Sequence, residues 1–208
     1  IGGKLLLRTT VSTTRTDTTN DDWVDLTNAA ASSTWYYVYA YNDAGVSWDI
    51  KFDENAPNAS DTSSNANGDL IYRQFSGVWY RCLQAVRNDS GGDLIKFYSV
   101  GNTVIYDTWT TSLSAGTATV FTDLSLATAV PLVSTRAIII LEFTVPAANH
   151  QVHVRANGSS STGGHRYDVW DDDTVEVLCD TDATQIIEYK LATATSLDVH
   201  VKGYINNC

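Results

Sequence analysis

The sequence predicts an all-β protein built from antiparallel sheets. Many short segments, about a dozen in all, are rich in β-branched and aromatic residues and alternate between apolar and polar positions. Turn-forming Gly, Asn and Asp residues separate these segments. No stretch repeats its apolar residues with the period of an amphipathic helix. Strands that follow one another through short turns are typical of antiparallel pairing.

The chain opens with extended segments. Residues 4–11 alternate and predict a first strand, and residues 23–26 predict a short one. Between them, residues 9–22 are rich in Thr, Asp and Asn, a composition that favours an extended, solvated stretch over a helix. We expect residues 1–19 to form an extended N-terminal segment or the end of a shaft.

Two predicted hairpins organise the first half of the chain. In the first, two strongly alternating strands flank a turn at 42–45; in the second, residues 79–98, the turn lies at 88–92. A polar loop at 54–69 separates the two hairpins. The predicted strands of this half are 34–41, 46–53, 70–75, 79–87, 94–98 and 103–106.

The composition changes near Asp107, where aromatic residues become rarer and small and β-branched residues more frequent. We therefore predict a small antiparallel β domain at 20–107 and an antiparallel β-sandwich of jelly-roll type at 108–208. The predicted strands of the second half are 117–121, 135–145, 150–155, 174–179, 185–191 and 196–205.

Two of these strands predict which faces are buried. Residues 135–145 are apolar on one face throughout and on the other face at Ile138 and Ile140, which predicts a central strand covered on both sides. The last strand alternates sharply. Its predicted inward residues are Leu197, Val199, Val201, Gly203 and Ile205.

The charge balance excludes some partners. The net charge is −11, with 13 Lys and Arg residues against 24 Asp and Glu residues, and both halves of the chain are acidic. Nucleic acids and anionic membranes attract basic surfaces, so we expect neither as a partner. No apolar run is long enough to span a bilayer, and membrane insertion is not expected.

The three cysteines have no metal-binding or disulfide-rich pattern. An odd number without a C-x-x-C motif predicts neither a disulfide framework nor a zinc site. Cys82 lies inside a predicted strand, and we expect it to be a buried thiol. A bond between Cys179 and Cys208 stays open as an alternative.

No catalytic signature stands out. The three consecutive aspartates at 171–173 do not converge in an extended chain and predict a solvated turn, with a calcium loop as the alternative. The serines at 159–161 lack the G-x-S-x-G elbow. Paired carboxylates for glycoside hydrolysis assemble in space, so the sequence leaves them open. We expect a non-enzymatic protein without catalytic residues, metal or cofactor.

One stretch suits ligand binding. A loop rich in Gly and Ser leads into a segment where aromatic and polar side chains alternate, and a sugar ring stacks on the former while its hydroxyls bind the latter. Alternatively, this segment begins a strand that packs on the core or on a neighbouring subunit. The candidate ligand-binding residues are His165, Arg166, Tyr167, Asp168 and Trp170.

Several motifs resemble those of phage tail-fibre and other virion-fibre proteins. They are hairpins and aromatic pairs, and they cover most of residues 20–208. In chain order they are TWYYVYAY at 34–41, Ala-Pro at 56–57, Tyr-Arg at 72–73, WYRCLQAVRNDSGGDLIKFY at 79–98, ATAVPL at 127–132 and VKGYI at 201–205.

The resemblance implies a structural virion appendage, a fibre or tip that assembles as a homotrimer and contributes to host attachment. Its implied partners are further copies of itself, other virion proteins, and a host-surface glycan or protein. Its implied location is the extracellular virion. The alternative function is a carbohydrate-binding module or lectin of cellular origin, because the same fold class serves both.

Overall fold

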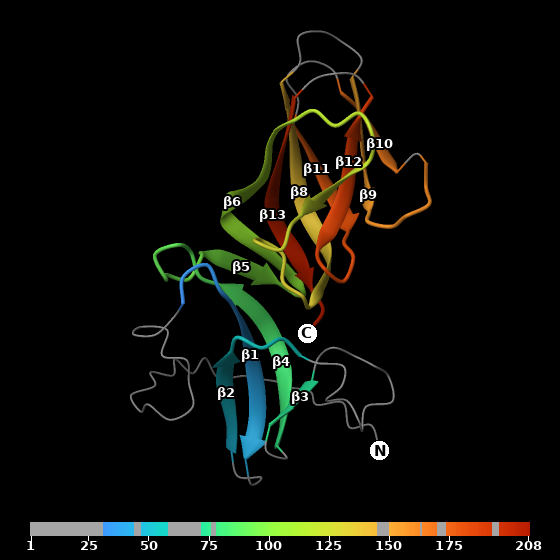
Figure 1. The fold of residues 1–208 in the computed structure, drawn as a ribbon. Helices are drawn as coiled ribbons and strands as arrows, with labels where there is room; N and C mark the ends of the chain where they lie inside the picture. Colours follow the sequence, from blue (N-terminus) through green and yellow to red (C-terminus); the bar gives the residue numbers. More distant parts are fainter. Residues whose placement is uncertain are drawn as a thin grey trace.

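A computed structural model describes residues 31–43, 47–57, 72–75, 78–144, 150–162, 164–169, 174–192 and 196–208. Every strand in these ranges belongs to one of three antiparallel sheets, so the predicted all-β class is confirmed (Figure 1). The predicted strands 4–11 and 23–26 lie outside the described residues. Within the described ranges, no helix has the length and apolarity needed to cross a membrane.

The first sheet contains the first predicted hairpin. Its outer strand pairs in register from Tyr37 opposite Asp53 to Asp43 opposite Ser47, which confirms the hairpin predicted at 34–53. The four strands, in sheet order, are β2 (Ser47–Asp53), β1 (Trp35–Asp43), β4 (Val78–Arg87) and β3 (Tyr72–Phe75).

The second predicted hairpin, at 79–98, is wrong. Strand β4 and the returning strand β5 (Phe97–Val100) start to pair through a single bridge, Asn88 to Leu94, and then enter different sheets. The turn itself is present, and the backbone amide of Gly91 donates to the Asp89 side chain at 2.7 Å. Because β1 and β3 already occupy both edges of β4, β5 pairs instead with the strand that follows it.

The remaining strands form two sheets that pack face to face around one apolar core. Ile139 and Leu141 from one sheet meet Val152 and Tyr189 from the other within this core. The four-stranded sheet has the order β10 (His165–Val169), β9 (His150–Ala156), β12 (Ile186–Leu191) and β7 (Thr122–Ser125). The five-stranded sheet has the order β11 (Thr174–Asp180), β8 (Ser134–Thr144), β13 (Ser196–Asn206), β6 (Thr103–Gly116) and β5.

Some strand bounds differ from those predicted from the sequence. Strand β6 is much longer than the predicted strand 103–106, and the strand predicted at 117–121 is wrong, because the backbone bends there between β6 and β7. Both β5 and the start of β6 belong to the sandwich. The change from the first sheet to the sandwich therefore falls between β4 and β5, before the boundary predicted at 107.

Strand β8 is buried on both faces, as predicted. Ile138 and Ile140, on its outer face, are only 8% and 4% exposed. The Lys202 ammonium and the Glu176 carboxylate lie 2.5 Å apart and join the two strands that flank β8. Their long side chains thus cover this face, as amphipathic stems do when only the charged head needs water.

A β-bulge changes the direction of the last strand. The register of β13 against β6 and β8 shifts between Val201 and Gly203. Before the shift, the inward positions are those predicted. After it, Tyr204 and Asn206 are buried and Ile205 is partly exposed, so the predicted inward position of Ile205 is wrong. One extra residue exchanges the two faces of a strand because side chains alternate with a period of two.

The residues after the bulge hold the first sheet against the end of the sandwich (Figure 1). The Tyr204 hydroxyl donates to the Ala85 carbonyl of β4 at 2.7 Å, and the Asn206 amide donates to the Leu83 carbonyl at 2.9 Å. The Trp35 ring meets Tyr204 edge to face, at 6.0 Å between centroids. These contacts join β1 and β4 to β13.

A disulfide bond also joins the two parts of the fold. Cys82 of β4 is bonded to Cys208, with their Cα atoms 5.2 Å apart. The expectation that Cys82 is a free thiol is therefore wrong, and so is a bond between Cys179 and Cys208. Cys179 is the free, buried cysteine. The bonded pair is separated by 126 residues, and local sequence spacing carries no information about such a contact.

We predict that Gly203→Ala strongly destabilises the protein. An added Cβ would lie 2.0 Å from the Val104 carbonyl oxygen, in the middle of the β13–β6 ladder. We expect the free energy of unfolding, measured by urea denaturation, to fall by about 2–4 kcal/mol. Gly101→Ala is the control, because Gly101 has φ +59° but no atom within 4 Å of the added carbon. The free energy of unfolding of this control should fall by about 1 kcal/mol. Equal decreases in the two variants would contradict the predicted clash with the Val104 carbonyl.

Candidate functional site

Four of the five predicted ligand-binding residues lie on β10, an edge strand that pairs only with β9 within the described residues. The fifth, Trp170, lies outside the described residues. The segment that starts at His165 is therefore a strand, which was the alternative interpretation of this stretch.

The four residues divide between the two faces of the sheet. Arg166 and Asp168 lie on the outer face and form an ion pair of 2.7 Å, with both side chains 53% exposed. Tyr167 lies on the inner face opposite Val152 and packs against the core, where burial raises its pKa. His165, two residues before Tyr167, lies on the same face of the strand but is exposed. The four described residues therefore do not assemble around one cavity.

A second group on the outer face was not predicted. The Arg155 guanidinium lies 3.7 Å from the centroid of the Phe121 ring, and the Lys190 ammonium lies 4.5 Å from it. Arg155 also forms two hydrogen bonds with the Glu188 carboxylate, of 2.7 and 3.1 Å. Only 16% of the Arg155 side chain and 12% of the Glu188 side chain are exposed, so this pair is largely desolvated.

This group fastens the Gly/Ser loop to the sheet. Arg155 donates to the Ser161 carbonyl, and Lys190 donates to the Thr162 carbonyl at 3.4 Å. At the start of the loop, the Asn157 amide donates to Asp182 at 2.8 Å. Residues 157–162 of this loop are thus held at both ends by hydrogen bonds. The donors of Arg155 are used within the protein, so this group is a structural clamp.

The same contacts affect the Asp182 carboxylate. Burial disfavours its charged form, but hydrogen bonds from Ile186, Asn157 and Thr184 outweigh that effect and lower its pKa to about 2. A carboxylate that accepts several hydrogen bonds stays ionised at neutral pH. Asp182 thus acts as a cap for the turn between β11 and β12 and as the anchor of the loop.

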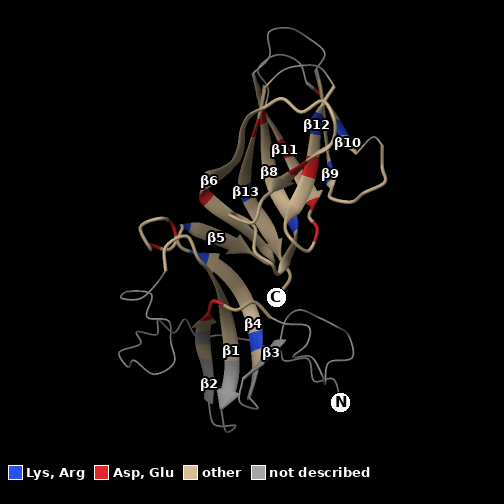
Figure 2. Cartoon of the chain, in the orientation of Figure 1, with Lys and Arg blue, Asp and Glu red and all other residues tan. Residues whose placement is uncertain are grey.

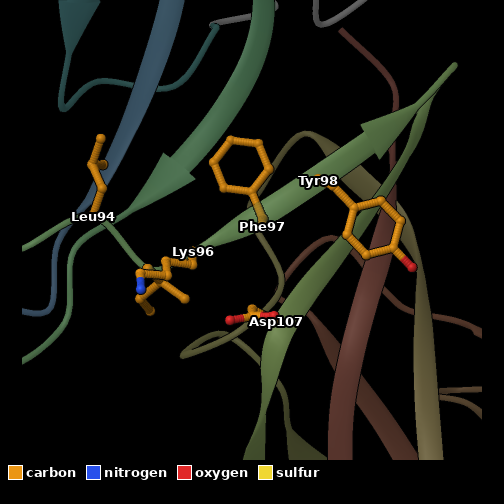
Figure 3. A pocket seen from close by; sticks show the side chains of 6 residues that line it. Leu94, Lys96, Phe97, Tyr98 and Asp107 are labelled. Carbon is orange, nitrogen blue, oxygen red and sulfur yellow. The ribbon is translucent and has the colours of Figure 1, made fainter.

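Exposed apolar side chains gather on and beside β5. Leu94, Tyr98 and Val100 are 42%, 57% and 71% exposed, and we call them the β5 surface. Phe97 packs against the core, whereas Tyr98 lies on the outer face of the sheet (Figure 3). Val100, two residues after Tyr98 in β5, shares its face. A cavity of about 520 Å³ opens here, lined by Leu94, Ile95, Lys96, Phe97, Tyr98 and Asp107.

An aromatic and polar group lies further along the outer face of the same sheet. Trp109 is 46% exposed, and its ring lies 6.1 Å from the His200 ring. His200 is oriented through both ring nitrogens, by the Thr111 hydroxyl at 3.0 Å and the Glu142 carboxylate at 3.2 Å. We call these four residues the Trp109 cluster. They come from β6, β8 and β13, so no sequence motif connects them.

The described residues contain no group of three His, Cys, Asp or Glu side chains that could hold a metal ion. The aspartates at 171–173 lie outside the described residues. No family model matches this chain, and no curated protein matches it either.

We predict different effects for the two arginines of the outer face. Arg155→Ala leaves the Glu188 carboxylate largely buried and unpaired, so the free energy of unfolding should fall by about 3 kcal/mol. Hydrogen exchange in residues 157–162 should also become faster. Arg166→Ala removes an exposed pair and should cost below about 1 kcal/mol. Urea denaturation with hydrogen-exchange mass spectrometry measures both effects, and a loop unaffected by Arg155→Ala would contradict the clamp.

Proposed function

We propose that this protein is a structural virion appendage, a phage fibre or tip protein that assembles as a homotrimer and contributes to host-surface attachment. The motifs that resemble virion-fibre proteins support this, as does the all-β architecture. The role requires neither catalysis nor a cofactor. Its partners are further copies of the chain, other virion proteins and a host-surface glycan or protein, and its location is the virion.

The β5 surface is the observation that carries the proposal. Edge strands of soluble proteins usually carry charges that prevent association. Strand β5 has the sequence FYSV and carries no charge (Figure 2), and two of its side chains are more than half exposed. An apolar edge of this kind is stabilised when another chain covers it.

A second copy of the chain is the occupant that fits this edge. Lys96 and Asp107 are both exposed and line the same cavity beside the β5 surface. In a cyclic trimer each copy presents one patch to a different patch of the next copy. The β5 surface of one copy then meets another surface of the next copy, and Lys96 and Asp107 lie at the rim of this apolar contact, where charges of both signs fix the register.

We predict a mass of about 68 kDa by light scattering, three times the 22.7 kDa of one chain. Val100→Lys should reduce it to the mass of one chain without changing the circular dichroism spectrum, because a charge is placed in the apolar contact. Val120→Lys is the matched control, since Val120 is 70% exposed against 71% for Val100 but lies between β6 and β7. A wild-type monomer, or equal effects of the two variants, would overturn the proposed assembly.

Carbohydrate binding is the second candidate function, and the Trp109 cluster favours it. An exposed indole face accepts the C–H face of a sugar ring, and Glu142, with a side chain 53% exposed, can accept hydrogen bonds from hydroxyl groups. Within the described residues the Trp109 indole N–H has no hydrogen-bond partner, so it remains able to donate to a ligand.

We predict that glycan-array binding, where present, depends on Trp109. Trp109→Ala should weaken binding by more than about tenfold, because a stacked aromatic ring is lost. Trp109→Phe should retain part of it. Leu178→Ala is the control, since Leu178 is also exposed on the outer face of this sheet, at 49%. Binding that is unchanged in Trp109→Ala would exclude the cluster as the sugar site.

A further inference from the structure

The Cys82–Cys208 bond connects parts of the fold that other contacts already hold together. Cys82 lies in β4, in the same strand whose carbonyls accept hydrogen bonds from Tyr204 and Asn206. Cys208 lies just beyond these two residues and packs in a small apolar cluster with Cys82, Ala85 and Val133. Non-covalent contacts therefore hold the chain segments that carry the two sulfur atoms against each other, in addition to the bond.

We propose that this disulfide is a redox-controlled latch. The first sheet docks on the sandwich while both cysteines are reduced, and the bond closes by thiol–disulfide exchange once the protein leaves a reducing compartment. The latch itself depends only on the geometry of the pair. The moment at which it closes rests on the proposed function, because a virion protein is made in a reducing cytosol and acts outside the cell.

The exposure of the two cysteine residues determines the order of the reaction. Cys208 is partly exposed, whereas Cys82 is 0% exposed. The Cys208 thiolate attacks oxidised glutathione, forms a mixed disulfide and releases one glutathione thiolate. The Cys82 sulfur, after losing its proton, then attacks the Cys208 sulfur and releases the second. Two thiol protons leave, and two electrons pass to glutathione.

Cys179 provides an internal control. It is 1% exposed, and burial raises its pKa to about 12, so it holds almost no reactive thiolate at neutral pH. Exchange is thereby confined to Cys82 and Cys208. The same argument makes reduction begin at the more exposed residue, Cys208, since an external thiolate reaches it first.

The test uses the purified chain in glutathione buffers of defined redox potential. Differential alkylation with mass spectrometry reports each cysteine, and hydrogen exchange reports the docked region. In reduced protein we expect Cys208 to be alkylated before Cys82, with Cys179 unreactive. The amides of Asn206 and Asn207, which bond to Asn102 and Val133, should exchange on the order of tenfold faster, while β1 and β4 keep their protection.

Two variants complete the test. Cys208→Ser should behave like the reduced protein in every buffer, and Cys179→Ala should respond to glutathione like the wild type. Loss of protection in β1 and β4 on reduction would overturn the latch, because the bond would then be required for docking. Failure of Cys82 and Cys208 to pair in oxidised glutathione would overturn it too. These outcomes do not depend on the oligomeric state, so they are separate from the test of the virion role.

Discussion

The bulge at Lys202 is the constraint on which the arrangement of the sheets depends. Before it, β13 contributes Leu197, Val199 and Val201 to the sandwich core. After it, the opposite parity turns Tyr204 and Asn206 toward β4, where they bind two backbone carbonyls. With regular alternation, Ile205 would take the inward position and neither hydrogen bond would form. The bulge thus converts a core strand into a docking element within one stretch of chain.

The docking of the first sheet on the sandwich in turn explains why β5 is an apolar edge strand. The chain leaves β4 through a turn and crosses directly into the five-stranded sheet, so β5 lies where the first sheet meets the sandwich. Its inner residue Phe97 packs against the core, while Tyr98 and Val100 face outward. An apolar strand at this junction is a defined surface for another chain, because β6 fixes its backbone along one edge, and the Ile95 amide just before it donates to the Arg87 carbonyl of β4.

The local part of the fold could be predicted from the sequence, and the non-local part could not. Strands such as β1, β2 and β8 show a two-residue period or an unbroken apolar run, which depends only on neighbouring residues. The partner of β5, the bond from Cys82 to Cys208 and the bulge in β13 depend on contacts between distant segments. The same limit applies to function. The composition of β10 indicated a site, but alternation placed Arg166 and Tyr167 on opposite faces.

The two outer faces of the sandwich consequently have different capacities for binding. On the four-stranded sheet, Arg155 and Lys190 lie over the Phe121 ring and donate hydrogen bonds to the loop at 157–162, so these cations are engaged within the chain. On the five-stranded sheet, Tyr98 and Trp109 remain exposed on the outer face. Because a surface gains most from a partner where apolar area is still in contact with water, we place both candidate contacts, for assembly and for ligand, on the five-stranded sheet.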